Sequence, residues 1–438
     1  MGSVDIPTGV RFRWFRFGCA LFPCLAVSPA AIVGRMVSRR GFHKVAGAGI
    51  AALAFSSRVG NAAASGPKPA PLSSAGSARV SLAASRAGEA SGNVATAVRR
   101  AAEEATDFAW LSRGDSVLIK PVCNSGNTFP ATTDPAALHA MILLLKEKGA
   151  GRVLVGDMSG VQFVRFQKDS LTGSTRSLMK SAGLLQAAEE AGAEVVAFEE
   201  AGWDGFVPER PRQGPDWRGE ILMPEVVDRV DHIVLMPRCA RHVLAGSTLG
   251  LKAAVGWWRT DSRLEYHHDA GSFSRKTAEA NSVPSLLDKQ RLVLSSGTKV
   301  LTTFGPDQGF IAEPEVGLVY ASTSVLAHDM VSLAWLIENQ QRATPRSARE
   351  GFLDDPNQNG LAVNLINRGV TYILGGGLSG FLSAETLERY DLDSVWDDRV
   401  LREGFRMNGG VPDLELAAAD HDVPAELQAR LEAATQLS

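Results

Sequence analysis

The sequence predicts an α/β fold of the doubly wound type, a mostly parallel sheet with helices on both faces. Short apolar runs typical of buried strands alternate with helical stretches along the body of the chain. Several of these runs end at Pro or Gly followed by polar residues, as strands do at the edge of a parallel sheet. The chain has 438 residues, of which 45% are apolar, so it can bury a large core.

The first clear unit predicts a β-α-β arrangement. Residues 116–119 form a buried apolar run, and Pro121 ends it because proline cannot donate to a neighbouring strand. Asp134 precedes a proline and predicts an N-cap, while Gly149 predicts the end of that helix. A second apolar run, 152–155, then predicts a parallel partner strand.

The alternation continues through the rest of the body. We expect strands at 194–198, 232–236, 298–303 and 316–320, and helices at 93–106, 174–192, 224–230, 425–435 and after Thr323 or Ser324. The polar segment 257–285 breaks the rhythm, and long irregular segments of this kind are typically functional or unstructured. We therefore expect it to be a loop.

The N-terminal part predicts export. Ser38 to Lys44 reads Ser-Arg-Arg-Gly-Phe-His-Lys, the twin-arginine pattern, and an apolar stretch and a cleavage motif ending at Ala64 follow. We expect residues 1–64 to be the leader, with Met36 as an alternative start, and the twin-arginine translocase as a partner. The protein would then be periplasmic or extracellular, or tethered to the membrane if the leader stays uncleaved.

The remaining sequence divides into three expected parts. Residues 65–92, rich in Ala, Ser, Gly and Pro, predict a flexible linker. Residues 93–340 hold the alternating pattern and predict the main domain. Residues 341–438, with weak periodicity, predict an extension packed on that domain or flanking it.

Charge and cysteine content exclude some functions. The net charge is -3 and the body has no basic run, so the sequence gives no basis for nucleic-acid binding. Of the four cysteines, only Cys123 and Cys239 lie outside the leader, so this chain alone cannot supply four thiolates to an iron-sulfur cluster. The two strands they follow could bring them within disulfide reach, or both could be buried free thiols.

Polar residues follow the predicted strands where ligands bind in such folds. Lys120 and Asn124 follow the first strand, Asp157 the second, and Arg238 and His242 the strand 232–236. Lys120 and Arg238 could neutralise an anion, while His242 and Asp157 could transfer protons or bind a metal. The plainer alternatives are a solvated lysine and a turn aspartate.

These motifs resemble those of the DUF362 family, over roughly residues 115–340. The resemblance rests on Val-Leu-Ile-Lys-Pro at 117–121, Thr-Asp-Pro at 133–135, Val-Gly-Asp at 155–157, Pro237-Arg238 with His242, Thr-Leu-Gly-Leu-Lys at 248–252, Tyr266-His267, and Ala321 to Asp329. The family has no general reaction assigned. The resemblance implies that many relatives carry ferredoxin-type cluster domains or an export leader.

Further candidates lie beyond the strand ends. Lys252 stands in an apolar run, where a buried unpaired lysine would be costly, so we expect a partner or a bound anion there. Arg259 lies in a lid or at the edge of the core, and Asp329 is a ligand-binding residue or a salt-bridge partner. His242, His267 and His268 are candidate metal ligands, although the adjacent pair at 267–268 also suits a polar loop.

The sequence thus predicts an exported enzyme-like protein with a strand-end pocket for a small anionic ligand, and with a divalent metal as a candidate cofactor. One alternative is a solute-binding protein that carries out no reaction. Another is a redox partner whose iron-sulfur cluster lies on a different subunit.

Overall fold

The computed structural model describes residues 74–86, 92–343, 360–388 and 390–437. The expected leader, residues 1–64, and the alternative start at Met36 lie outside the described residues. Within the described ranges, no helix combines the length and the apolar character that crossing a membrane requires.

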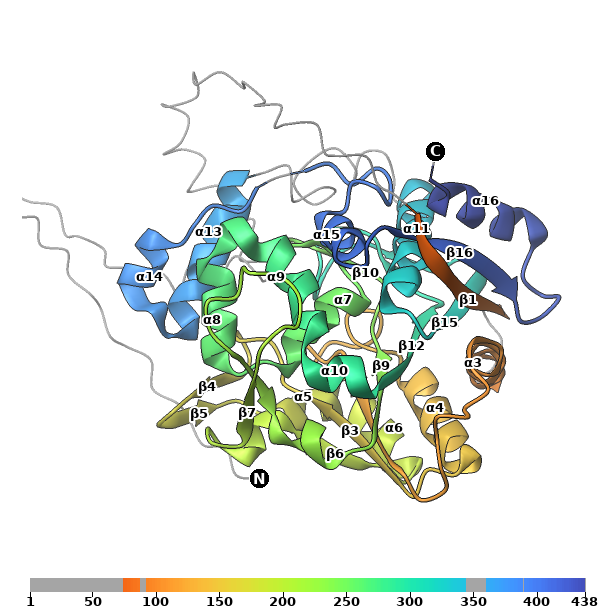
Figure 1. Cartoon of the computed structure of the whole chain (residues 1–438), viewed down its shortest axis with the longest axis horizontal. Helices are drawn as coiled ribbons and strands as arrows, with labels where there is room; N and C mark the ends of the chain where they lie inside the picture. The colour runs from red at the N-terminus through yellow and green to blue at the C-terminus, as the bar shows by residue number, and fades with distance from the viewer. Residues whose placement is uncertain (1–73, 87–91, 344–359, 389, 438) are drawn as a thin grey trace, which may run out of the picture.

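An eight-stranded sheet runs through the described chain (Figure 1). Seven of its strands point the same way, and β15 runs antiparallel to both of its neighbours. Across the sheet the strands are β16 (Val411–Ala418), β1 (Ser74–Arg86), β15 (Val316–Ser322), β12 (Gln290–Gly297), β9 (His232–Met236), β2 (Ser116–Pro121), β3 (Arg152–Asp157) and β6 (Glu194–Ala197). The predicted fold class, a mostly parallel α/β sheet, is confirmed.

The chain builds the parallel part of the sheet outward from β2 in two directions. It passes from β2 to β3 and β6, then returns to β9 on the other side of β2 and continues to β12. This is a doubly wound order, in which the direction of winding changes between β2 and β9. The loops after these two strands diverge and leave a crevice at their carboxyl ends. The topology therefore directs attention to the residues after Pro121 and Met236.

Alternate residues of each central strand pack into different cores. Val117 and Ile119 of β2 belong to the cluster under α3 and α4, whereas Leu118 belongs to a cluster on the opposite face with Trp257 and Tyr266. This alternation follows from the two-residue repeat of a strand. Lys120 therefore lies on the Leu118 face, although its side chain is charged.

Helices cover both faces of the sheet. The first face is packed against α3 (Gly92–Ala105), α4 (Pro135–Lys148), α5 (Thr175–Ser181) and α6 (Leu184–Glu190). The second face is packed against α7 (Gly250–Ala253), η3 (Ala254–Trp257), α8 (Thr260–His268), η4 (Ala270–Ser272), α9 (Phe273–Glu279), η5 (Ala280–Ser282), α10 (Pro284–Lys289), α11 (Val325–Ala343), α15 (Arg399–Met407) and α16 (Ala425–Thr435).

Three smaller sheets lie outside the central sheet in the described chain. A four-stranded sheet has the order β11 (Gly246–Thr248), β10 (Ala240–His242), β13 (Val300–Leu301) and β14 (Ile311–Ala312). Two hairpins pair β4 (Arg165–Gln167) with β5 (Ser170–Thr172) and β7 (Phe206–Glu209) with β8 (Ile221–Pro224). Short 3-10 turns complete the list: η1 (Phe198–Ala201) and η2 (Glu225–Arg229).

Helix ends follow the signals in the sequence. The Asp134 carboxylate accepts from the Ala136 N–H at the start of α4, and Gly149 ends this helix with φ 115°. Ser324 Oγ accepts from the Ala327 N–H at the start of α11. The expected helix 174–192 is two helices, because Gly183 adopts φ 82° between them.

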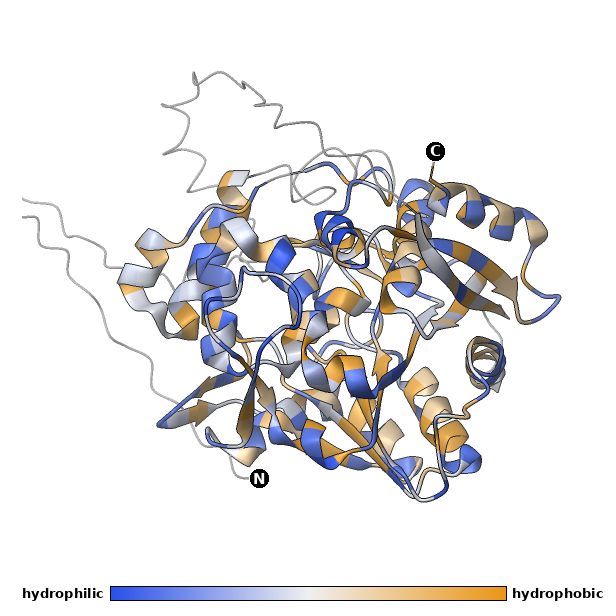
Figure 2. Ribbon diagram, viewed as in Figure 1, coloured by the Kyte–Doolittle hydropathy of each residue, from blue (hydrophilic) through white to orange (hydrophobic). Residues whose placement is uncertain are grey.

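Two expectations about irregular segments were wrong. Residues 74–86, part of the expected linker 65–92, form β1 between β15 and β16. The expected loop 257–285 is a series of short helices, because its charges satisfy one another. Lys276 Nζ, fully buried, contacts Glu265 at 2.7 Å and Asp269 at 2.8 Å. Figure 2 shows α8 and α9 as hydrophilic helices beside apolar strands.

The C-terminal part joins the main body at two places. Strand β16 pairs with β1 and extends the central sheet. Helix α13 (Gly360–Thr371), the turn η7 (Tyr372–Gly376) and α14 (Gly377–Ser383) lie beside α8, at the left of Figure 1. Asn367 of α13 bonds to both the ring and the backbone carbonyl of His267 in α8. This second contact brings the C-terminal residues to the carboxyl end of the sheet.

Candidate functional site

A cavity of about 140 Å³ lies where the loops after the strands meet α7, α8 and α13. At ~30 Å³ for each water molecule, this space holds roughly five waters. Its polar lining comes from Asn124, Gln162, His242, Lys252, Arg263, His267, Asp307 and Gln308. Residues that lie far apart in the sequence therefore line one small cavity.

Lys252 is the most unusual residue of this cavity. It stands on α7 directly after Gly250 and Leu251, whose N–H groups donate to the Asp329 carboxylate at 2.8 and 2.7 Å. Within the described residues its ammonium has no carboxylate partner; it lies 5.6 Å from the ring centre of Tyr266 and 5.7 Å from that of Phe273. Burial, together with the charges of Arg238 and Arg263, lowers the pKa of Lys252 to about 7.

Two buried guanidinium groups add positive charge. Arg263 lines the cavity and donates to the carbonyls of Trp258, Ser159 and Met158 at 2.7 to 2.9 Å. Within the described part of the chain, it forms no ion pair with a carboxylate. Burial lowers its pKa to about 10. Arg238 follows β9, and its Nε and Nη1 atoms are buried without a hydrogen-bond partner among the described residues. Burial lowers the pKa of Arg238 as well.

His242 and His267 line the same cavity with opposite hydrogen-bonding character. Nδ1 of His242 accepts from the backbone N–H groups of Leu244 and Ala245, so its proton is on Nε2, which is a donor. Nδ1 of His267 donates to the Asn367 carbonyl oxygen at 2.8 Å, because the amide nitrogen of Asn367 already donates to the His267 carbonyl. Nε2 of His267 is therefore an acceptor.

Both imidazoles are neutral near pH 7. Burial and the nearby positive charges of Lys252 and Arg238 lower the pKa of His242 well below its ordinary value. Burial lowers the pKa of His267 to about 3, although its hydrogen bond to Asn367 opposes that shift. The two rings thus offer one N–H donor and one lone pair, while the positive charge comes from lysine and arginine.

A single carboxylate lines the described part of the cavity. Asp307 accepts from Asn124 Nδ2 with both oxygens at 3.0 Å, and from Gln162 Nε2 at 3.0 Å. These hydrogen bonds from the side-chain amides of Asn124 and Gln162 hold Asp307 beside the loops that follow β2 and β3. Asn124, a predicted ligand-binding residue, therefore lies at the cavity, where one role is to fix Asp307.

Lys120 and Asp157, predicted as catalytic residues, form a buried ion pair instead. Lys120 Nζ lies 2.8 Å from Asp157 Oδ1, and it also donates to the carbonyls of Pro121 and Ala253. The Asp157 carboxylate accepts from the N–H groups of Cys123 and Met158. A Cβ at Gly256 would come within 2.3 Å of Asp157 Oδ1, so backbone covers the pair. Neither residue lines the cavity, and both are fully bonded.

Two further predicted ligand-binding residues have structural partners. Arg259 makes a two-bond ion pair with Asp261, donates to the Trp203 carbonyl and stacks 4.2 Å from the centre of the Trp203 ring. Asp329 contacts His328 at 2.9 Å in addition to anchoring the start of α7. Neither residue lines the cavity, so neither is placed to contact a ligand there. Asp329 instead positions the helix that carries Lys252.

Of the two alternatives for Cys123 and Cys239, a bridge or a pair of buried thiols, the structure shows the thiols. Both thiols are free and buried. Cys123 Sγ contacts the Ser125 carbonyl at 3.5 Å, whereas Cys239 Sγ contacts the Ser332 carbonyl on α11 at 3.2 Å. The two belong to different core clusters, because the loops after β2 and β9 turn apart. Burial raises the pKa of Cys239 to about 12 and also raises that of Cys123.

The three candidate metal ligands do not converge. His242 and His267 line the cavity, but His268 contacts Asp269 and Ser383, near the surface. Consecutive residues on a helix point in different directions, which separates His267 from His268. No group of three or more His, Cys, Asp or Glu side chains suited to a metal occurs among the described residues.

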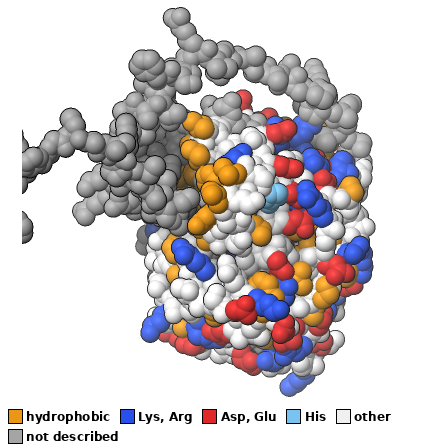
Figure 3. Space-filling view, turned by 90° about the vertical axis from the view of Figure 1, so that its left-hand side faces the viewer, with side chains coloured by type: hydrophobic (Ala, Val, Ile, Leu, Met, Phe, Trp, Pro, Cys, Tyr) orange, Lys and Arg blue, Asp and Glu red, His pale blue; other side chains and the backbone are white. Residues whose placement is uncertain are grey.

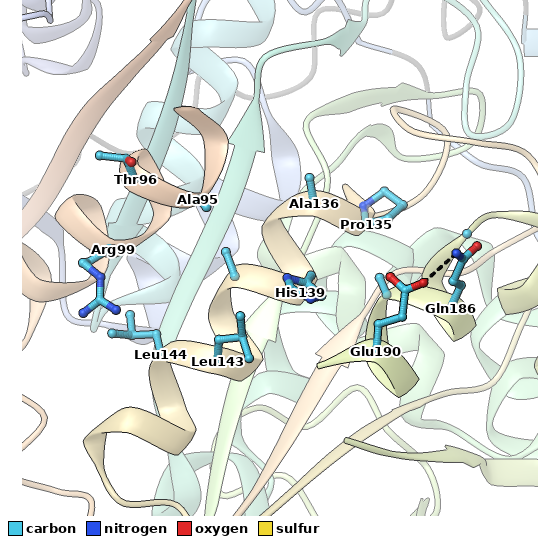
Figure 4. Close-up of a pocket in the computed structure, with 13 residues that line it drawn as sticks. Ala95, Thr96, Arg99, Pro135, Ala136, His139, Leu143, Leu144, Gln186 and Glu190 are labelled. Atoms are coloured by element: carbon cyan, nitrogen blue, oxygen red, sulfur yellow. Dashed lines mark hydrogen bonds between the residues drawn. The ribbon is translucent and has the colours of Figure 1, made fainter. Parts of the chain in front are cut away.

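A larger hollow of about 760 Å³ lies between α3, α4 and α6 (Figure 4). It is lined by helix side chains, many of them alanine and leucine, and His139 points into it. Its charged groups are already bonded: Arg99 contacts Glu147, and Glu190 accepts from Gln186. Among the described residues that line this hollow, none is a buried charge without a partner, so we place the candidate site at the smaller cavity.

Arg263 and the C-terminal lining residues were missed by the sequence analysis. Arg263 lies in the segment expected to be a loop, and Ile366, Val370, Ile373 and Leu374 lie in the part with weak periodicity. The one available signal was the position of Arg263 three residues before Tyr266-His267. Helical spacing would have placed its side chain beside those residues.

The fold and the site define a doubly wound α/β protein with a cation-rich cavity at the carboxyl ends of its strands. Residues 117–334 match the family model described as "Domain of unknown function (DUF362)". The chain belongs to the DUF362 family through these residues. The predicted resemblance is confirmed, while no curated protein matches the chain.

One solved structure with some likeness is that of the lactate racemase apoprotein from Thermoanaerobacterium thermosaccharolyticum. It shares 13% sequence identity with this chain, at a TM-score of 0.32. The aligned part covers 51% of this chain and 50% of that one, so the chain spans about half the length of that protein.

Proposed function

We propose that this protein binds a small anion in the cavity around Lys252 and acts on it as an enzyme. The observation that carries the proposal is a largely buried lysine that lines the cavity, lacks a carboxylate partner among the described residues and feels the charges of two buried arginines, Arg238 and Arg263. Burying an unpaired ammonium costs several kcal/mol. A bound anion offsets that cost, whereas an empty cavity does not.

The proposed chemistry uses the protonation states that the geometry favours. With a pKa of about 7, Lys252 exchanges a proton near neutral pH, which suits a general acid or base. Nε2–H of His242 would donate to the anion, and Nε2 of His267 would accept a hydrogen bond from a ligand hydroxyl or C–H acid. The field of Arg238 and Arg263 would stabilise negative charge that develops on the substrate.

Anion binding should depend on pH in a defined direction. The anion favours the charged ammonium, so its affinity falls as pH rises through about 7, and binding above that pH takes up a proton. Isothermal titration calorimetry with acetate and with phosphate, in two buffers of different ionisation enthalpy, measures both effects. An affinity that stays constant from pH 6 to 9 would contradict the role of Lys252.

Substitution of Lys252 gives the direct test. Lys252→Met should weaken acetate or phosphate binding about thirtyfold or more, as expected for the loss of a buried charge partner. Lys180→Met, at an exposed lysine on α5, is the matched control and should bind as the unchanged protein does. Unchanged binding by Lys252→Met would remove the cavity as the anion site.

Measuring whether the protein converts its ligand distinguishes an enzyme from a non-catalytic solute-binding protein. Native mass spectrometry of the exported protein would identify an anion that it retains. If that anion is recovered unchanged after long incubation with the protein, the binding alternative is favoured. A new product that His242→Ala fails to form would favour the enzyme.

We further propose that the protein is exported through the twin-arginine translocase to the periplasm or beyond. The proposal rests on Ser38 to Lys44, the apolar stretch 45–55 and the cleavage motif at Ala64. A protein with Arg39→Lys and Arg40→Lys together should remain in the cytoplasm in cell fractionation. Equal export of both proteins would contradict this route.

A further inference from the structure

The cavity has two chemically different walls. One wall carries Lys252, Arg263, His242 and His267, which supply positive charge and hydrogen bonds. The other is aliphatic and comes chiefly from the C-terminal residues Ile366, Val370, Ile373 and Leu374 of α13 and η7. A ligand that fills this space meets both walls at once.

The aliphatic wall is built from a segment that reaches the cavity from far along the chain. Asn367 fixes α13 to His267, and this contact directs Ile366 and Val370 of the same helix to the cavity. The outer side of the segment is apolar too: Leu361, Leu365, Leu378 and Leu382 are exposed, and Figure 3 shows apolar side chains on this face. The helix therefore offers neighbouring positions that differ in whether they face the cavity.

The carboxylate of Asp307 limits the charge of the ligand. It lines the cavity and is held there by Asn124 and Gln162, so it is a fixed part of the lining. A ligand with a second negative charge would place that charge against Asp307 or against the aliphatic wall, and both are unfavourable. A neutral ligand would leave Lys252 buried without a partner.

We infer that the ligand is a small monocarboxylate with a compact branched or aromatic apolar group, its carboxylate at Lys252 and its apolar group against α13 and η7. This inference rests on the proposed anion site and names the substrate class of that site. The cavity volume of about 140 Å³ suits a compact group, and isovalerate and benzoate are examples of this class. The apolar group would displace water from a wall that cannot hydrogen-bond to it.

The test compares ligands that share a carboxylate and differ in the apolar group. Calorimetric titration of the full-length protein at pH 6.5 would use isovalerate and benzoate, with acetate, succinate and inorganic phosphate as comparison anions. We expect isovalerate or benzoate to bind about tenfold or more tightly than acetate, since each added methylene in an apolar pocket contributes roughly tenfold or more. Succinate and phosphate should bind more weakly than isovalerate.

A matched pair of substitutions on α13 locates the effect. Ile366→Thr, at the cavity, should lower isovalerate affinity about tenfold and leave acetate affinity nearly unchanged. Leu365→Thr, at the exposed neighbouring position, should change neither. Circular dichroism spectra and unfolding temperatures of both proteins check that the helix remains folded.

The outcomes separate this inference from the proposal on which it rests. If acetate or phosphate binds as tightly as isovalerate, and Lys252→Met abolishes that binding, the apolar preference is wrong and the anion site stands. If none of the probes shows binding that depends on Lys252, the anion site itself is wrong. A large loss of isovalerate affinity in Leu365→Thr would also overturn the assignment of the aliphatic wall.

Discussion

 Lys120 and Lys252, two lysines near the carboxyl ends of the strands, have opposite surroundings. The two lie close together, because Lys120 Nζ donates to the carbonyl of Ala253, the residue after Lys252, at 3.4 Å. Lys120 pairs with Asp157 and two carbonyls, whereas Lys252 faces aromatic rings and lies near two arginines. The first arrangement satisfies a buried charge within the protein, and the second leaves a charge for a ligand to satisfy. Burial alone therefore does not mark a functional lysine, while a missing counterion does.

The largest expected effect breaks the satisfied pair. Lys120→Met leaves the Asp157 carboxylate buried without its partner, so we expect a loss of about 3–5 kcal/mol in the free energy of unfolding. Urea denaturation followed by circular dichroism measures it. Adding Asp157→Asn should recover part of the loss, because the stranded charge is gone. A loss below about 1 kcal/mol for the single change would show that the pair is not a structural element.

The same substitution at the other lysine should act in the opposite direction. Lys252→Met removes a buried charge that has no carboxylate partner in the described structure, so at pH 6 and without ligand it should leave stability unchanged or raise it by about 1–2 kcal/mol. Denaturation is measured in a buffer free of small carboxylates and phosphate, because a bound anion would stabilise the unchanged protein. A loss as large as that of Lys120→Met would mean that the two lysines do not differ in the way described.

The dependence of this difference on pH sharpens the comparison. Lys252 has a folded-state pKa of about 7, below the ordinary value of 10.5, so between these pH values the unfolded chain binds more protons. The stability of the unchanged protein relative to Lys252→Met should therefore rise with pH between about 7 and 10.5 and stay level below 7. Denaturation curves for both proteins at pH 6, 8 and 9.5 measure the slope. A difference that is independent of pH would contradict the lowered pKa.

The smallest expected effect concerns the two cysteines. Because Cys123 and Cys239 are free and lie in different clusters, adding a reductant should change the unfolding temperature very little. Peptide mapping without reduction should find both residues unlinked in the full-length protein. A peptide pair joined through Cys123 and Cys239 would show that the ends of β2 and β9 approach more closely than described.

Much of the fold follows from local signals. The strand-end residues and helix caps at Asp134, Gly149 and Ser324 act through neighbours a few positions away, so the sequence predicts them well. Strand β1 escaped prediction because Ala, Ser and Gly carry little strand signal. It is placed by its neighbours: Ser81 Oγ donates to carbonyls of α3 and β15, and β16 pairs along its other edge.

The candidate site was predicted only in part. Lys252 and His242 were found because an apolar run and a strand end reveal them locally. The pairing of Lys120 with Asp157 could not be found, because it depends on neighbouring β2 and β3 presenting both side chains to the same face. The C-terminal lining residues could not be found either, since Asn367 meets His267 across 100 positions of sequence.

The sequence by itself determined the alternation of strands and helices, the family motifs and the set of charged residues near the strand ends. Short-range periodicity and capping encode the first, and residue identity the others. Only the tertiary structure decided which charges satisfy one another and which remain for a ligand. That distinction depends on distances between residues far apart in the chain, and the electrostatic cost of a buried charge is set by those distances.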